Sequence, residues 1–390
     1  MLGNPYTPGA GCIPPYLAGR ERLISSAEIS LDRLLKGFPQ RSIIYYGLRG
    51  VGKTVLLNTL ETAAENMEIK YTHIEASESG MFLSRLLLAF NKFLKQMSVV
   101  ESVKTLAVRA MKAIASFTVA YDISVGKFSL EYSPDEAPVN GIMEDDLTEI
   151  LVALGRCAGE SKNAICVFID EFQYVSKEHA KAVVTALHRC NQLRLPVMFV
   201  CAGLPKVIQV VSTACSYAER IFIYEEVGRL SDDEARAAIA EPAASLGVAY
   251  EDGALSSIVK TSQGYPYFIQ EFCSAIWEHI ENCAVITENM VDASKKIFFD
   301  RLDVGFFAAR MSRCSRAERA FMLAMAECGG ESCTIGDVAH HLKKEPRQVS
   351  PVRAKLIEKG MIYPPARGEL AFTVPLFGDY IKRNQTFVDD

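Results

Sequence analysis

The sequence predicts an α/β fold, in which helices cover both faces of a parallel sheet, followed by a helical region and a small C-terminal module. From Ser42 to Tyr224, short apolar runs alternate with segments of helical periodicity. From Ser231 to about Gly305 the periodicity is helical throughout, and from Ser315 three short helices precede two short strands. Strands that alternate with helices are typical of a parallel sheet, because each connecting helix packs on a face of that sheet.

The elements of the α/β part follow from apolar runs bounded by turn residues and from helical periodicity. A first short helix is expected near 26–36. The expected strands are 42–46, 71–75, 164–170, 196–201 and 221–224. The helices expected between them are 53–65, 80–95, 144–158, 177–190 and 205–213. Parallel strands end at one edge of the sheet, where open α/β sheets bind ligands.

Residues 98–142 interrupt this alternation, and we expect them to form an insertion. The segment 101–115 has helical periodicity. Residues 117–133 read FTVAYDISVGKFSLEYS, an alternating pattern that predicts two strands with a turn at Val125 and Gly126.

Residues 47–54 read GLRGVGKT and satisfy the pattern G-x-x-x-x-G-K-[ST] of a phosphate-binding loop. The motif follows an expected strand and opens an expected helix, as it requires. Its glycines let successive main-chain N–H groups point at phosphate oxygens, and the helix adds its positive end. Lys53 would contact the β- and γ-phosphates, and the Thr54 hydroxyl would bind Mg²⁺. The phosphate-binding residues expected here are Gly47, Arg49, Gly50, Val51, Gly52, Lys53, Thr54 and Val55.

A pair of acidic residues ends an apolar strand. Residues 165–171 read ICVFIDE, so Asp170 and Glu171 stand at the carboxyl end of an expected buried strand. Asp170 would orient Mg²⁺ and its waters, and Glu171 would accept the proton of an attacking water. A solvated strand end is the alternative interpretation, which the upstream loop disfavours.

Taken together, these motifs resemble those of AAA+ P-loop ATPases, in particular the group that links origin-recognition-like, archaeal-type and STAND signalling ATPases. The matching elements are LAGRERLI at 17–24, the phosphate-binding loop, the Asp-Glu strand, AERIF at 218–222, GYP at 264–266 and a C-terminus similar to a winged helix. The resemblance implies an extended N-terminal arm at 1–17 and a P-loop NTPase core with a three-layer parallel sheet at 18–228. A helical lid at 229–310 and a winged-helix-like domain at 311–390 would follow.

The resemblance also implies roles for residues outside the loop. Gly19 and Arg20 match a box that packs near the adenine, and Pro266 matches a lid turn that closes over nucleotide. Arg220 stands where related ATPases place a catalytic arginine that reaches the γ-phosphate of a neighbouring subunit. A local ion pair with a neighbouring glutamate is the alternative for Arg220.

Two departures from the family pattern indicate slow hydrolysis. After strand 196–201 the chain continues as Ala202, Gly203 and Leu204, where related motors carry a polar sensor. The lid helix after Pro266 reads YFIQEFC, without the arginine of many relatives. We therefore expect a slow, Mg²⁺-dependent ATPase that acts as a nucleotide-driven switch. The alternatives are an ATP-gated signalling scaffold without hydrolysis and a DNA-associated regulator or initiator.

The C-terminal segment makes DNA a candidate partner through residues 343–367. A helix is expected to start at Ser315 in the pattern S-x-x-E, and another is expected to be capped by Ser350, to begin at Pro351 and to close at Gly360. Docking on the ATPase core is the alternative role of this segment. The basic residues on or beside the face that would read DNA are Arg347, Lys355, Lys359 and Arg367.

The composition is that of an ordinary globular chain of 390 residues, with 49% apolar and 23% charged residues. The net charge of −5 disfavours a protein that coats nucleic acid along its whole length. Eleven scattered cysteines without a CxxC pair favour a reducing environment over a disulfide or zinc framework. No apolar run approaches the length of a membrane span. We expect a cytoplasmic protein, with a homo-oligomer or a protein partner as candidates.

Overall fold

The computed structural model describes residues 3–77, 80–123, 141–279 and 283–384. The chain divides into two compact units, and each is described by itself. The sheet unit comprises Arg20–Gly47 and Lys53–Val227. The helical unit comprises Met1–Gly19, Leu48–Gly52 and Gly228–Asp390.

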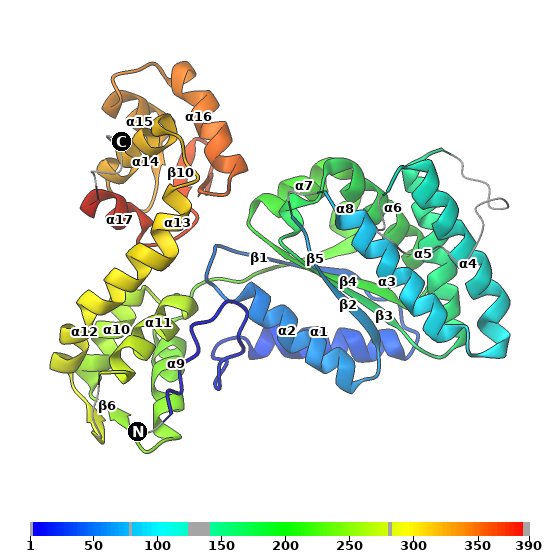
Figure 1. The fold of residues 1–390 in the computed structure, drawn as a ribbon, viewed down its shortest axis with the longest axis horizontal. Coiled ribbons are helices and arrows are strands. Elements are labelled where there is room, and N and C mark those ends of the chain that lie inside the picture. The colour runs from blue at the N-terminus through cyan, green and yellow to red at the C-terminus, as the bar shows by residue number, and fades with distance from the viewer. Residues whose placement is uncertain (1–2, 78–79, 124–140, 280–282, 385–390) are drawn as a thin grey trace. The chain divides into compact units, whose positions relative to one another are not determined.

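The sheet unit contains a parallel sheet with the strand order β2-β3-β4-β1-β5 (Figure 1). β3 and β4 are buried along their whole length, which explains why their sequences are continuous apolar runs. Val200 on β4 is in register with both Ile43 on β1 and Phe168 on β3, so the carboxyl ends of these strands lie at one edge. The strands are β1 (Ser42–Tyr46), β2 (Lys70–Glu75), β3 (Ile165–Asp170), β4 (Val197–Gly203) and β5 (Phe222–Glu226).

Helices cover both faces of this sheet, which confirms the predicted α/β core. Figure 1 shows α1 and α2 on one face, and α3, α5 and α6 on the other. A 3₁₀ turn, η1 (Phe172–Tyr174), follows β3 directly. The helices are α1 (Glu21–Leu35), α2 (Lys53–Asn66), α3 (Phe82–Met97), α4 (Glu101–Ala120), α5 (Met143–Glu160), α6 (Lys177–Gln192), α7 (Lys206–Ala214) and α8 (Ala218–Ile221).

One predicted strand in the segment 98–142 is wrong, because α4 continues through Ala120. Val103, Ala107 and Ile114 are buried at helical spacing, and Phe117 extends this stripe by one more turn. The Phe117 ring lies 4.6 Å from that of Tyr121, centroid to centroid. Helical packing of this aromatic pair therefore overrides the alternating pattern. The remainder of the predicted strand pair, including the turn at 125–126, lies within residues 124–140, outside the described residues.

The helical unit contains a helical part followed by a small α/β module. The first part was predicted to be purely helical, and this is wrong at one point, since β6 (Ala249–Tyr250) and β7 (Val285–Ile286) pair in parallel. A π-helical turn, η2 (Leu302–Phe307), and α13 (Ala308–Met311) follow. The helices of the first part are α9 (Asp232–Ala244), α10 (Asp252–Ser262), α11 (Pro266–Trp277) and α12 (Glu288–Arg301).

Three helices precede β9 in the C-terminal module, whose three-stranded antiparallel sheet has the order β8-β10-β9. The winged helix stays a prediction. Ser315 caps the first helix in a capping box with Glu318, as predicted. A further helix ends the module. The elements are α14 (Arg316–Cys328), β8 (Cys333–Thr334), α15 (Ile335–His341), α16 (Pro346–Glu358), β9 (Ile362–Tyr363), β10 (Glu369–Phe372) and α17 (Phe377–Arg383).

The predicted start of α16 is wrong. The helix begins at Pro346 rather than Pro351, and Glu345 with Gln348 forms its capping box. Val349, which precedes the predicted start, is buried, so packing draws the earlier turn into the helix. Ser350 does not cap a helix start; its hydroxyl donates to the Pro346 carbonyl at 2.9 Å.

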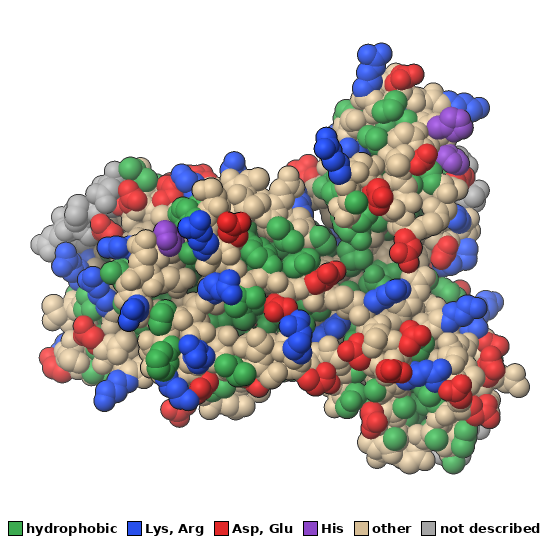
Figure 2. Space-filling model, turned by 180° about the vertical axis from the view of Figure 1, so that it is seen from behind, with side chains coloured by type: hydrophobic (Ala, Val, Ile, Leu, Met, Phe, Trp, Pro, Cys, Tyr) green, Lys and Arg blue, Asp and Glu red, His purple; other side chains and the backbone are tan. Residues whose placement is uncertain are grey.

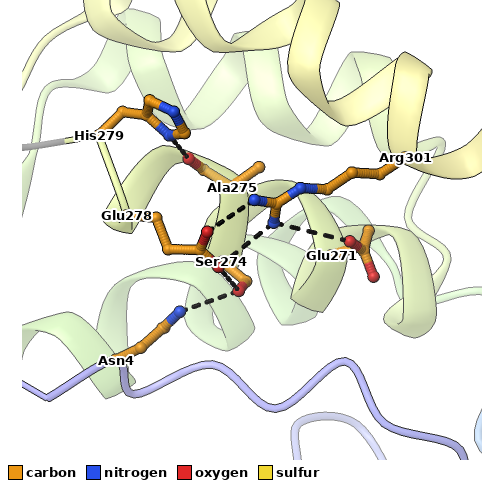
Figure 3. Close-up of polar contacts among 7 residues, drawn as sticks. All are labelled: Asn4, Glu271, Ser274, Ala275, Glu278, His279 and Arg301. Carbon is orange, nitrogen blue, oxygen red and sulfur yellow. Dashed lines mark hydrogen bonds and ion pairs between the residues drawn. The ribbon is translucent and has the colours of Figure 1, made fainter.

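The N-terminal arm packs on the helices of its own unit. The Tyr6 ring is buried edge-on against Trp277, and the Tyr6 hydroxyl donates to the Ile239 carbonyl at 2.6 Å. Figure 3 shows a polar cluster beside this contact, in which the Asn4 amide donates to the Ser274 hydroxyl at 2.9 Å. Arg301 in the same cluster lies 2.6 Å from Glu278. The arm is thereby tied to α11, and α11 to α12.

Within the described ranges, no helix has both the length and the apolar character needed to cross a membrane.

Candidate phosphate-binding site

The loop between β1 and α2 adopts backbone conformations that glycine residues make possible. Gly50 and Gly52 adopt φ of 82° and 90°, a region that side chains with a Cβ rarely enter. α2 begins at Lys53, as predicted from the motif. Because the first N–H groups of a helix have no partner within that helix, α2 directs the positive end of its dipole at this loop. The local geometry is that of an anion-binding turn.

Lys53 is a buried cation at the mouth of the loop. The Lys53 residue is only 7% exposed, and its Nζ donates to the Gly47 carbonyl at 2.9 Å. The Gly47 N–H in turn donates to the Gly203 carbonyl at the end of β4, at 3.2 Å. Hydrogen bonds between an ammonium and an anion are stronger than those between neutral groups, so this position suits a negatively charged ligand.

Thr54 and Asp170 form a pair of adjacent oxygen donors. The Thr54 hydroxyl donates to Asp170 Oδ2 at 2.6 Å, and Asp170 is only 5% exposed. The other carboxylate oxygen, Oδ1, accepts the Glu171 N–H at 2.8 Å. Mg²⁺ prefers hydroxyl, carboxylate and water oxygens, so the residues present at this position fit that ion.

Glu171 follows Asp170 in a left-handed backbone conformation, with φ 53° and ψ 37°. For a residue other than glycine this conformation costs about 1 kcal/mol and is enriched at functional sites. The Glu171 carbonyl accepts the Tyr174 N–H at 2.9 Å, which closes η1. The Glu171 carboxylate accepts a hydrogen bond from the Gln173 amide. Both acidic residues therefore stand at the sheet edge where β1 and β4 also end.

Gln173 is the residue that sequence reasoning missed. Its side chain is 7% exposed although the residue is polar, and it is hydrogen bonded at both ends of its amide. The sequence did show a polar residue two positions after Glu171, which could have indicated a role for Gln173 at the site. The sequence could not show that its second partner lies at the end of β4.

Arg220 is placed in α8 with an exposed side chain. Among the described residues, no ion pair of Arg220 is found. The nearby Glu225 is paired instead with Arg22 at 2.8 Å. The role of Arg220 toward a neighbouring subunit stays a prediction.

In the helical unit, the predicted residues occupy tight backbone positions. Gly19 has φ 67°, and a Cβ there would lie 2.5 Å from the Glu234 carboxyl carbon. Pro266 is the first residue of α11, and the next N–H, of Tyr267, donates to the Gly50 carbonyl at 3.1 Å. The Arg49 N–H donates to the Thr373 carbonyl at 3.2 Å. The adenine and lid roles of these residues remain predictions.

The remaining predicted residues are Arg20, Val51 and Val55, which are buried or half-buried. Arg20 precedes α1, which starts at Glu21 rather than near residue 26, and is 7% exposed. Val51 is buried in the loop. Val55 is half-buried in the first turn of α2.

Comparison with family models gives two matches. Residues 16–200 match the model described as the AAA ATPase domain. Residues 304–381 match a domain of unknown function, DUF8462. The first match includes the loop, Asp170 and Glu171.

Comparison with solved structures shows that the fold occurs elsewhere. The Walker-type ATPase PABY2304 of Pyrococcus abyssi is similar over 94% of this chain and 96% of its own, with 14% identity and a TM-score of 0.54. A mutant RuvB of Thermotoga maritima is similar over 94% of this chain and 95% of its own, with 15% identity and a TM-score of 0.47. The ORC1 protein of Aeropyrum pernix, solved in complex with DNA, is similar over 97% of this chain and 95% of its own, with 13% identity and a TM-score of 0.46. No curated protein matches the sequence significantly.

Proposed function

We propose that this chain, an AAA+ P-loop ATPase by its matched domain and its fold, binds ATP with Mg²⁺ and hydrolyses it slowly as a nucleotide-driven switch. The observation that carries the proposal is the 2.6 Å hydrogen bond between Thr54 and Asp170 beside the buried Lys53 ammonium. A cation, a hydroxyl and a carboxylate at the end of a glycine-rich loop suit a triphosphate and its metal ion.

In this proposal each residue has one task. The main-chain N–H groups of the loop hold phosphate oxygens, and Lys53 exchanges the Gly47 carbonyl for the β- and γ-phosphates. Thr54 and Asp170 would hold Mg²⁺, which neutralises developing charge on the phosphates when it is bound. Glu171 orients the attacking water and takes its proton. Arg220 would act on the γ-phosphate of a neighbouring copy, which implies a homo-oligomer.

The slow rate follows from what the sheet edge lacks. β4 ends in Gly203, and the next two residues, Leu204 and Pro205, are apolar. α11 reads PYFIQEFCSAIW and carries no arginine. Two groups that would stabilise charge on the γ-phosphate are therefore missing from these two elements, and transition-state stabilisation is reduced.

Turnover of the purified full chain tests this proposal. Hydrolysis of labelled ATP is followed with protein in excess and then with ATP in excess, each with Mg²⁺ and with EDTA. We expect Mg²⁺-dependent hydrolysis well below about one turnover per second, at the low end of ordinary enzymes. Turnover of many ATP molecules per second without a partner would contradict the switch. Binding without hydrolysis, unchanged by oligomerisation, would favour the signalling scaffold.

DNA association is a second candidate function, favoured by exposed basic side chains before and within α16. Lys343, Lys344, Arg347 and Lys355 are all exposed. Lys359, in contrast, is paired with Glu318 at 2.7 Å and donates to the Arg313 carbonyl, so it is not available as a phosphate contact. On the face shown in Figure 2, basic and acidic side chains are interspersed rather than separated.

A titration of duplex DNA at several salt concentrations tests this second candidate. Binding through these side chains should weaken steeply as salt rises, and reversing the charge of Lys343, Lys344 and Arg347 should remove it. No binding at low salt, or binding insensitive to salt, would leave the docking role for this module.

A further inference from the structure

Gln173 joins the acidic pair to the end of β4. Its Oε1 accepts the Leu204 N–H at 2.9 Å, and its Nε2 donates to the Glu171 carboxylate. A primary amide has one acceptor and one donor end, and here each end has a different partner. The residue is 7% exposed, so solvent does not compete strongly for either bond.

The space for this amide exists because residue 203 is glycine. A Cβ on Gly203 would lie 2.6 Å from Gln173 Oε1 and 3.1 Å from Val207 Cβ. No side chain larger than hydrogen fits there without moving the amide. The side chain that lies against the end of β4 thus comes from η1, which follows β3, and both ends of its amide are already hydrogen bonded.

The same strand end reaches the phosphate-binding loop. The Gly203 carbonyl accepts the Gly47 N–H at 3.2 Å, and the Gly47 carbonyl accepts Lys53 Nζ at 2.9 Å. A continuous path of hydrogen bonds and adjacent peptides therefore runs from Glu171 through Gln173 and the end of β4 to Lys53. Every residue of this path belongs to the sheet unit.

We propose that Gln173 is a positioning residue, which orients the Glu171 carboxylate and links its orientation to the β4 end and the phosphate-binding loop. The inference rests on the proposed function, since it gives Glu171 the role of base. The left-handed backbone of Glu171 fixes where its side chain leaves the chain, and Gln173 then fixes the carboxylate. A carboxylate held in one orientation presents a defined lone pair to an attacking water.

The decisive variant is Gln173→Glu. It keeps an acceptor for the Leu204 N–H and nearly the same volume, but it replaces the N–H donor by a second carboxylate facing Glu171. Two adjacent carboxylates repel each other, so this variant removes the contact that holds the Glu171 carboxylate in one orientation. Single-turnover hydrolysis should therefore fall about tenfold, while ATP affinity stays within about twofold of the wild-type value.

Two further variants separate positioning from folding. Gln173→Met keeps the length of the side chain but loses both hydrogen bonds, so we expect a lower single-turnover rate with ATP affinity within about twofold of the wild-type value. Gln270→Glu makes the same chemical change at another buried glutamine, in the helical unit, where Oε1 accepts the Thr7 N–H at 2.9 Å. It should leave the single-turnover rate unchanged.

The outcomes distinguish this inference from the proposed function. If Gln173→Glu leaves the single-turnover rate unchanged while Glu171→Gln stops turnover, Gln173 has no positioning role. An equal loss of rate in Gln270→Glu would mean that the rate reports general stability, and would overturn the inference as well. If the wild-type chain binds ATP but shows no hydrolysis at any pH, the catalytic part of the proposed function and this inference both fall, whereas nucleotide binding stands.

Discussion

The Thr54 hydroxyl donates a 2.6 Å hydrogen bond to the Asp170 carboxylate, and so joins the first turn of α2 to the end of β3. The two residues are 116 positions apart, and the strand order β3-β4-β1 brings them to one sheet edge. Their oxygens form the part of the site that a divalent cation would use. Substitution at Thr54 therefore separates metal binding from the rest of the site.

Replacing Thr54 by Val should remove the strengthening of ATP binding by Mg²⁺, because valine keeps the shape but not the hydroxyl. A hydrogen bond to a charged group contributes about 1.5–3 kcal/mol, so affinity in the presence of Mg²⁺ should fall at least about tenfold. Thr54→Ser, which keeps the hydroxyl, should retain most of the effect. Titration of ATP with Mg²⁺ and with EDTA measures both. Equal Mg²⁺ dependence in all three proteins would show that Thr54 is no ligand.

Replacing Glu171 by Gln should preserve ATP affinity and reduce turnover by about 10²–10⁴-fold, the usual contribution of a general base. The amide has the same size and can still accept a hydrogen bond, but it cannot take a proton. Single-turnover hydrolysis and equilibrium binding should be measured on the same preparation. Glu178→Gln, an exposed glutamate in the first turn of α6, is the control. Undiminished turnover in the Glu171 variant would assign the base elsewhere.

Gly264, which lies between α10 and α11, should tolerate alanine worse than Gly247 does. Both have positive φ, 71° and 77°, which costs alanine about 1 kcal/mol in either place. At Gly264 the added Cβ would also lie 2.6 Å from the Leu230 carbonyl oxygen, whereas at Gly247 it would meet nothing within 4 Å. We expect Gly264→Ala to lower the free energy of unfolding by about 3 kcal/mol and Gly247→Ala by about 1 kcal/mol. Similar losses in denaturant unfolding would show that the turn moves freely.

Glu318 should make the C-terminal module sensitive to acid. Burial raises the pKa of Glu318, but hydrogen bonds from Lys359 and from the Ser315 N–H outweigh this and leave the pKa below its ordinary value. A carboxyl whose pKa is lowered by folding stabilises the fold above its unfolded pKa of about 4.3, and this contribution is lost as the pH falls through the folded pKa.

Glu318→Gln should therefore cost about 2 kcal/mol of unfolding free energy at pH 7 and flatten the decline of stability below about pH 4. Glu327→Gln, on the same helix but more exposed, should change neither. Denaturant unfolding from pH 7 to pH 3, followed by circular dichroism, makes the comparison. An unchanged acid profile in the Glu318 variant would mean that other carboxyls control it.

The parallel sheet and the two ends of the site could be predicted from the sequence, since each depends on local pattern. Glycines around Lys53 predict the loop, and an apolar run predicts that Asp170 ends a buried strand. The proximity of the loop and Asp170 was inferred from the topology of parallel sheets, in which the carboxyl ends of the strands lie at one edge. Predicting these features requires no knowledge of which side chains from distant segments contact them.

The parts that could not be predicted depend on packing between distant segments. The second partner of Gln173 is a main-chain N–H 31 residues away. The arm residue Tyr6 bonds to a carbonyl 233 residues away. The start of α16 was misplaced because Pro351 reads as a helix start, whereas burial of Val349 extends the helix past it. Tertiary contacts outweigh local preference in each case.

Equilibrium titration of nucleotide onto Lys53→Ala and wild-type protein tests the central claim most directly. The Lys53 side chain is buried beside the loop, so its removal should weaken ATP binding about a hundredfold, while the exposed Lys36→Ala control binds normally. Circular dichroism should show all three proteins equally folded. Unchanged ATP affinity in folded Lys53→Ala protein would contradict the account, because it would place the nucleotide site elsewhere.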